Sequence, residues 1–201
     1  IGGSGEDRGL DIDVDDKGMV YVVGDTRSPK FPVKMAFQKK LKGDKDGFLM
    51  KVHKRGKKLI YSAYLGGTQD EETRDIDVDK WGNAYVIGST NSSDFPVAKA
   101  LYQTLAGDYD IFLMKFKKKG KRVHFSTYMG GAGLDNGHSV RVDTDGTIYI
   151  RGYTESKKFP TKDAFLKKYQ GDGDAIVAQI SADGQSLIFS TFFGGSKWER
   201  G

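Results

Sequence analysis

Short apolar runs separated by polar turns recur along the whole chain. Residues 10–14 alternate apolar and polar side chains, which is the period of a β-strand with one buried face. Residues 20–24 are almost continuously apolar, as expected for a strand covered on both faces. Residues 48–52 and 59–65 form two further runs of the same kind. The pattern predicts four short β-strands within the first 65 residues.

The connection between the second and third predicted strands is long, about 20 residues, and loops of this length usually carry structure or function. Pro32 is a residue that starts turns and helices, and Phe37 and Leu41 are spaced as neighbours on one helical face. Gly43 then offers a stop. We therefore expect one or two helical turns here, packed against the strands through the aromatic side chain.

The four-strand pattern repeats without a gap every 64 residues. Gly2-Gly3 returns as Gly66-Gly67, Gly130-Gly131 and Gly194-Gly195, and each step is 64 residues (66 − 2, 130 − 66, 194 − 130). Phe31-Pro32 likewise returns in the second and third copies. The repeat divides the chain into units 2–65, 66–129 and 130–193, and residues 194–201 open a fourth copy.

Four short antiparallel strands per repeat are typical of a β-propeller blade. Each such unit has two apolar faces, which it can bury only against neighbouring units. The predicted fold is therefore all-β, with three four-stranded blades. Closed propellers have about 4–8 blades, so we expect further blades from a longer chain or from other subunits. An open β-solenoid or a row of stacked sheets would share the period without closing a ring.

The second copy carries the family resemblance most clearly. It contains Gly-Asn-Ala-Tyr-Val-Ile-Gly-Ser-Thr at 82–90, Ser-Asp-Phe-Pro at 93–96, Gly-Asp-Tyr-Asp at 107–110 and Phe-Ser-Thr-Tyr-Met-Gly-Gly at 125–131. These strings resemble the seven-bladed beta-propeller (SBBP) repeat family of exported bacterial and archaeal proteins. The resemblance implies a location outside the cell or on its surface, with a role in adhesion, scaffolding or recognition. The chain departs from the family in its many lysines and in Arg141 and Arg151.

The amino-acid composition and charge exclude several kinds of site and partner. The absence of cysteine excludes disulfides, thiolate catalysis and cysteine-based zinc sites. The net charge of +5 arises largely from basic clusters at 54–58 and 117–122. Because the third copy has Ser-Ala-Asp-Gly-Gln-Ser at the equivalent 181–186, we interpret these clusters as solvated turns and expect no nucleic-acid partner. No apolar run approaches the roughly 20 residues of a membrane span, so we expect no membrane insertion.

Calcium is the cation for which the sequence offers ligands. Asp11 begins an acidic stretch, but Val22 stands where a calcium loop needs a bidentate Glu. A recurring Asp-x-Asp pair could supply oxygen ligands, although turn capping explains it more simply. The weak calcium candidates are Asp44, Asp46, Asp108, Asp110, Asp172 and Asp174. The three histidines occupy unrelated repeat positions and predict no zinc site.

Residues that break the repeat are the candidate ligand-binding positions, since residues present in every copy build the blade. A structural alternative is an ion pair between blades, for example Arg141 with Asp77. Exposed aromatic residues could also stack on sugar rings. The candidates are Arg74, Trp81, Tyr109, His138, Arg141, Arg151 and Tyr153.

The sequence favours a non-catalytic extracellular scaffold or interaction module within a larger propeller protein or filament. The recurring Ser62, Ser126 and Ser190 lie inside a predicted strand, which argues against a nucleophile. A glycan- or protein-binding module is the first alternative, with Trp81, Tyr109 and Tyr153 as stacking residues. A hydrolase with its active site in the propeller channel is the second. The expected partners are further blades and a protein or glycan at the cell surface.

Overall fold

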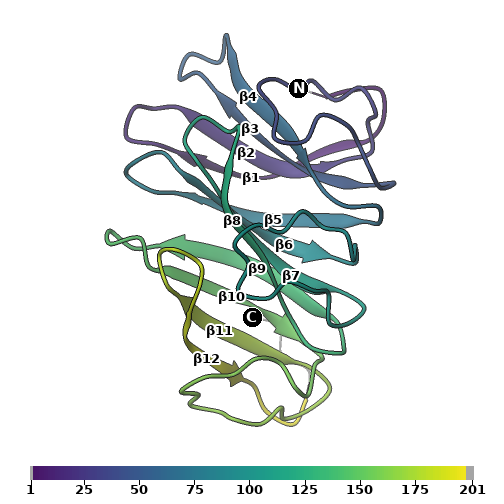
Figure 1. Cartoon of the computed structure of the whole chain (residues 1–201), viewed down its shortest axis with the longest axis vertical. Helices are drawn as coiled ribbons and strands as arrows, with labels where there is room; N and C mark the ends of the chain where they lie inside the picture. Colours follow the sequence, from purple (N-terminus) through teal and green to yellow (C-terminus); the bar gives the residue numbers. More distant parts are fainter. Residues whose placement is uncertain (1, 198–201) are drawn as a thin grey trace.

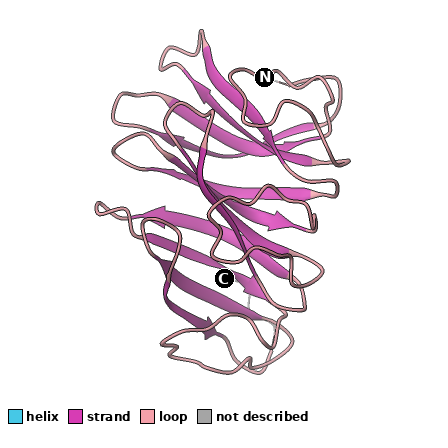
Figure 2. Ribbon diagram, viewed as in Figure 1, coloured by secondary structure: helices cyan, strands magenta, loops and turns pink. Residues whose placement is uncertain are grey.

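A computed structural model describes residues 2–197, which fold into three β-sheets and no helix (Figures 1 and 2). Blade 1, formed by the repeat unit 2–65, contains β1 (Asp7–Val14), β2 (Val20–Thr26), β3 (Asp46–Val52) and β4 (Leu59–Leu65). Blade 2, in units 66–129, contains β5 (Glu71–Val78), β6 (Ala84–Thr90), β7 (Asp110–Phe116) and β8 (Val123–Met129). Blade 3, in units 130–193, contains β9 (Asp135–Val142), β10 (Ile148–Thr154), β11 (Asp174–Ile180) and β12 (Leu187–Phe193).

Each blade is a four-stranded antiparallel meander in which neighbouring strands follow one another in the chain. The all-β class and the propeller-blade architecture predicted from the sequence are confirmed. The sheets follow one another along the long axis of the molecule, with blade 2 in the middle (Figure 1). Of the opening of a fourth copy at 194–201, residues 198–201 lie outside the described part. Within residues 2–197, no helix has the length and apolar character that a membrane crossing requires.

The helical turns expected after the second strand of each repeat are wrong. In blade 1 this connection runs antiparallel to the outer edge of β4, where Lys34 N donates to Ser62 O at 3.0 Å and Ser62 N to Lys34 O at 2.9 Å. Tyr64 N donates to Gln38 O further along, and the same bridges recur in blades 2 and 3. The backbone groups of the loop are therefore paired with the sheet, and a local helix would leave the edge of β4 exposed.

The recurring Phe-Pro motif anchors this connection to the blade. In blade 1, Phe31 N donates to the Tyr64 hydroxyl at 2.9 Å, and that hydroxyl donates to Ser28 O at 2.6 Å. The Phe31 ring lies 4.7 Å from the Phe48 ring, centroid to centroid. Blade 2 repeats the arrangement with Phe95 and Tyr128. The motif thus packs the loop over one face of its own sheet.

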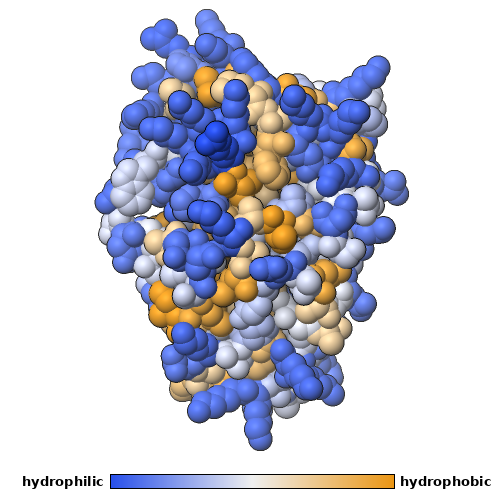
Figure 3. Space-filling view, viewed as in Figure 1, coloured by the Kyte–Doolittle hydropathy of each residue, from blue (hydrophilic) through white to orange (hydrophobic). Residues whose placement is uncertain are grey.

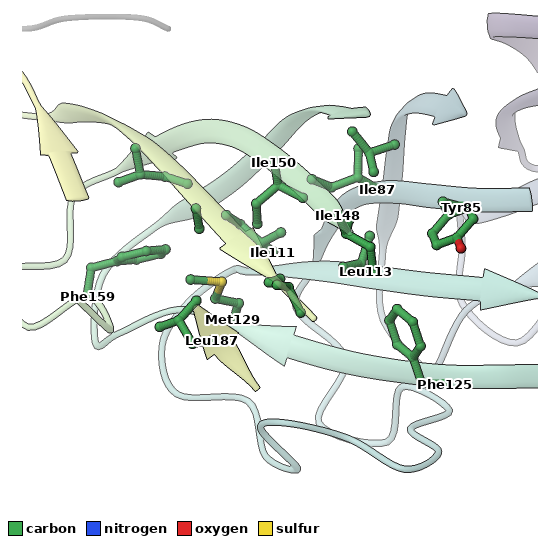
Figure 4. Packing of buried hydrophobic residues seen from close by; sticks show 14 of the residues in the cluster. Tyr85, Ile87, Ile111, Leu113, Phe125, Met129, Ile148, Ile150, Phe159 and Leu187 are labelled. Carbon is green, nitrogen blue, oxygen red and sulfur yellow. The ribbon is translucent and has the colours of Figure 1, made fainter. Parts of the chain in front are cut away.

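The main hydrophobic cores lie between blades. One cluster joins β2–β4 of blade 1 to β5–β7 of blade 2, and a second joins blade 2 to blade 3. Figure 4 shows Ile87 and Ile111 of blade 2 beside Ile150 of blade 3. Every residue of β6 (Ala84–Thr90), an inner strand of the middle blade, is buried. The stability of each sheet therefore depends on its neighbours, as expected for stacked repeats.

Glycine turns complete the contact between blades. Gly120, in the β7–β8 turn of blade 2, has φ = 70° and lies against the Tyr61 ring of blade 1, where an added Cβ would come within 2.3 Å of that ring. Gly184 in blade 3 lies in the same way against Phe125 of blade 2. The equivalent Gly56 of blade 1 meets no atom within 4 Å. The turns of blades 2 and 3 therefore each cover an aromatic ring of the preceding blade.

Candidate functional site

Carboxylates on the first strand of one blade bind the backbone of the next blade. Asp11 Oδ2 accepts the Ile76 N–H at 2.9 Å, and Asp75 Oδ2 accepts the Val140 N–H at 2.8 Å. These two N–H groups belong to equivalent positions of β5 and β9 and face the preceding blade. Asp77 similarly accepts the Val142 N–H at 2.6 Å. We call this set of carboxylates and N–H groups the inner-strand network.

The third copy changes this network. Ser139 and Arg141 stand where blades 1 and 2 carry aspartates, and both side chains turn back to Asp75. Arg141 Nη1 lies 2.9 Å from Asp75 Oδ2. The predicted ion pair of Arg141 with Asp77 is therefore wrong, because the Arg141 guanidinium turns to Asp75 instead. With a side chain 66 % exposed, Arg141 contributes a partly solvated ion pair.

Two neighbouring carboxyls of the network titrate differently. Burial raises the pKa of Asp11, and the adjacent Asp75 raises it further. Burial also acts to raise the pKa of Asp75, but hydrogen bonds from Asp11, Ser139 and the Val140 N–H hold that pKa below its usual range. A carboxyl pair with separated pKa values is one arrangement that suits acid–base chemistry. Here Asp75 Oδ2 already accepts hydrogen bonds from the Ser139 hydroxyl, the Val140 N–H and the Arg141 guanidinium.

A second set of carboxyls lies where one blade passes into the next. Burial raises the pKa of Glu71 to about 8, despite hydrogen bonds from Ser92, Thr90 and Gly67, and the negative charge of Asp46 raises it further. At the next junction, burial raises the pKa of both Asp110 and Asp135 to about 6. A Cβ on Gly66 would come within 2.8 Å of atoms of both Glu71 and Asp46, so the linker glycine is what lets these carboxyls approach.

The calcium candidates do not converge on one point. Asp44, Asp108 and Asp172 are exposed, whereas Asp46, Asp110 and Asp174 are buried. Asp46 accepts hydrogen bonds from Lys42 N, Gly43 N and the Gln38 amide at 2.7–3.1 Å, so it caps its own loop. Among residues 2–197, no three His, Cys, Asp or Glu side chains gather closely enough to hold a metal ion.

The remaining repeat-breaking residues are scattered over the molecule. Arg74 is exposed and pairs with Glu72 at 2.6 Å. Arg151 is exposed on β10, although its equivalents in blades 1 and 2 are fully buried apolar residues. His138 is half-buried on β9.

The three aromatic candidates differ in access to solvent. Tyr153 is 3 % exposed and donates its hydroxyl to Glu155 at 2.7 Å, so its ring is not available for stacking. Tyr109 is half-buried, and its backbone oxygen accepts the Asp135 N–H. Trp81, 53 % exposed, presents its ring to solvent.

Trp81 lies in the wall of a large hollow. The hollow measures about 780 Å³ and lies between the β5–β6 turn, the β7–β8 turn and the long connection of blade 1. Six of its ten lining residues are Lys or Arg, and none of the described residues that line it is acidic. Trp81 was expected as a ligand contact, whereas the basic turn at 117–122 was expected to be solvated. The turn that carries Trp81 and this basic turn in fact face one hollow, which the sequence did not reveal.

A family model described as a beta-propeller repeat (SBBP) matches residues 60–96. The matched segment contains β5, which contacts both blade 1 and blade 3, and β6, which contacts blade 3. The chain therefore contains a repeat of the SBBP beta-propeller family, and its 64-residue period places equivalent residues in the first and third blades. No curated protein matches the chain.

Proposed function

We propose that this chain is a non-catalytic structural module of a larger propeller, in which blade 1 packs against a further blade of the same repeat. The observation that carries the proposal is the apolar face of blade 1 that no neighbour covers. Ile12 is 61 % exposed, whereas the equivalent Ile76 and Val140 in blades 2 and 3 are 2 % and 0 % exposed. Leu10 and Val14 on the same strand are 41 % and 53 % exposed.

Apolar residues of β2 and β3 support the same conclusion. Val22 and Val52 are half-buried in blade 1, while their blade 2 equivalents Val86 and Phe116 are 0 % exposed against blade 1. The open face of blade 1 thus has the composition and layout of a face that is covered in the other two blades. Burying one large apolar side chain stabilises a protein by about 1.5–3 kcal/mol, so a blade on this face would add several contacts of that size.

The open face of blade 3 is different. Arg151 replaces residues that are buried in the other blades (Val23 and Ile87), and Arg141 replaces an aspartate of the inner-strand network. A charge that points toward a neighbouring sheet is a common device against edge-to-edge packing. The blade that covers blade 1 therefore resembles blade 2, with an apolar residue and aspartates at these positions.

A chain with an added blade tests this directly. A copy of residues 66–129 placed ahead of residue 2 keeps the natural Met–Gly–Gly junction, and its Asp75 and Asp77 would face Ile12 and Val14. We expect the free energy of unfolding of this four-blade chain, measured by urea denaturation, to exceed that of the three-blade chain by about 2 kcal/mol or more. The matched control adds residues 130–193 instead, which brings Arg141 and Arg151 to the new interface, and gives no such gain. Equal effects of the two additions would contradict the proposal.

The absence of catalysis is supported by where the recurring polar residues lie. Ser62, Ser126 and Ser190 are fully buried in the fourth strands beneath the long connections, and Asp75 is filled by three donors. A role outside the cell is supported by the resemblance to exported propeller proteins. Protease treatment of intact source cells tests the location: we expect cleavage of the protein without lysis, and full protection would contradict an extracellular position.

A further inference from the structure

The hollow beside Trp81 has walls fixed by several contacts. Lys118 N, in the basic β7–β8 turn, donates to the Asn83 side chain at 3.2 Å, which ties this turn to the one that carries Trp81. Gly120 of the same turn rests on the Tyr61 ring of blade 1. Met35, 44 % exposed in the long connection of blade 1, lies on the hollow as well. The hollow therefore depends on the docking of blade 2 onto blade 1.

The walls of the hollow are strongly positive. Lys117, Lys118, Lys119, Lys121 and Arg122 come from one turn, and Lys115 approaches from β7. Burial lowers the pKa of His124, and the nearby charges of Lys115, Lys117 and Lys99 lower it further. The lysines and the arginine of the hollow together create a positive potential, which attracts anions.

Trp81 adds an apolar platform at the edge of this positive region. Its equivalents in blades 1 and 3 are Lys17 and Asp145, so the indole is specific to blade 2. Lys80 Nζ lies 4.7 Å from the centre of the indole ring. A second hollow of about 280 Å³ shares Trp81, Lys118 and Lys119 with the first and extends toward blade 1. The face of the molecule in Figure 3 is mostly hydrophilic, with apolar patches between.

We propose that the Trp81 hollow binds an acidic polysaccharide. The apolar face of one pyranose ring would pack on the indole of Trp81, while its carboxylates pair with the lysines of the β7–β8 turn. A volume of about 780 Å³ falls within the range of small-molecule sites and accommodates a few sugar rings rather than a long polymer segment. This binding activity is independent of the structural role proposed above.

The local extent of the positive charge favours a polysaccharide over a nucleic acid. A protein that follows a phosphate backbone needs cations along the path of the strand. The equivalent turn of blade 1 is also basic, but that of blade 3 has no cation and contains Asp183, so the positive region does not continue onto blade 3. A single exposed indole also offers a platform for one ring, whereas sequence-independent binding of single strands uses several.

Isothermal titration calorimetry with hexagalacturonate tests the proposal, and the chain supplies matched variants. The test variant carries the blade 3 turn in blade 2: Lys118→Ala, Lys119→Asp, Lys121→Gln and Arg122→Ser. The control makes the same changes in the equivalent turn of blade 1: Lys54→Ala, Arg55→Asp, Lys57→Gln and Lys58→Ser. Both variants lose the same charge, and both copy a turn that this fold already contains.

We expect the blade 2 variant to weaken binding at least about 30-fold and the blade 1 control by about threefold or less, because only the first removes charges from the hollow. Trp81→Ala, which removes the indole without adding a charge, weakens binding about tenfold through the lost stacking surface. Similar losses in the two turn variants would show non-specific attraction and overturn the site. Tighter binding of a single-stranded oligonucleotide with the same variant pattern would overturn the polysaccharide assignment, and so would the absence of hexagalacturonate binding.

Discussion

Replacement of Asp75 by alanine should weaken the contact between blade 2 and blade 3 and so destabilise the fold. The carboxylate is 7 % exposed and accepts hydrogen bonds from the Val140 N–H and the Ser139 hydroxyl, besides its ion pair with Arg141. Loss of the acceptor leaves a buried N–H without a partner, which costs about 1–3 kcal/mol. The ion pair adds at most about 1 kcal/mol, since the Arg141 side chain is 66 % exposed. We therefore expect Asp75→Ala to lower the free energy of unfolding by about 1–4 kcal/mol.

Urea denaturation followed by fluorescence measures this change, with Asp13→Ala as the matched control. Asp13 lies on the inner strand of blade 1, but its carboxylate accepts the N–H of its own neighbour Val14 rather than that of another blade. We expect Asp13→Ala to change the free energy by less than about 0.5 kcal/mol. Asp75→Asn, which keeps an acceptor oxygen, should recover part of the loss. If Asp75→Ala were as mild as the control, the inner-strand network would not hold the blades together.

Three further predictions address the turns, the junctions and the fourth strands. Gly120→Ala and Gly56→Ala both place alanine at positive φ, which should lower the free energy of unfolding by about 1–2 kcal/mol each. In denaturation experiments Gly120→Ala should cost about 1–3 kcal/mol more than Gly56→Ala, because its Cβ meets the Tyr61 ring. Equal costs of the two substitutions would contradict this contact. Because burial raises the pKa of Glu71 to about 8, its contribution to stability is complete below the ordinary glutamate pKa and is lost as pH rises through about 8. Unfolding free energies measured from pH 5 to 9 should therefore fall, and Glu71→Gln should flatten the curve; an unchanged slope would refute the assignment. Ser126→Ala should cost less than about 0.5 kcal/mol, because the buried hydroxyl has no hydrogen-bond partner; a loss above about 1 kcal/mol would reveal one.

The repeat explains why so much of the fold followed from the sequence. Alternation along residues 10–14 and continuous burial along 20–24 are local signals, and three copies of each signal reinforce one another. The strands extend two or three residues beyond the predicted runs because polar residues such as Thr26 and Asp46 pair across the sheet. The helical turns failed because the i, i+4 spacing of Phe37 and Leu41 is a weak signal, and pairing with β4 determines the path of that loop.

The candidate site was harder to predict because it depends on contacts between copies. The sequence singled out Arg141 and Trp81 as repeat-breaking residues, and both lie at the surface of an inter-blade contact. It could not show that Arg141 reaches Asp75 and not Asp77, since that choice depends on the path of the Arg141 side chain across the contact between blades. The roles of Asp11 and Asp75 were also missed, although the replacement of this repeat position by Ser139 in the third copy was a usable signal.

The stacking of blades through the inner-strand network can be tested by hydrogen exchange at three equivalent amides. The Ile76 and Val140 amides donate to carboxylates of the preceding blade, whereas Ile12 lies on the open face of blade 1. In dilute protein, studied by nuclear magnetic resonance, the account predicts slow exchange at Ile76 and Val140 and fast exchange at Ile12. Fast exchange at all three amides, or equal protection of Ile12 in the dilute monomer, would contradict it.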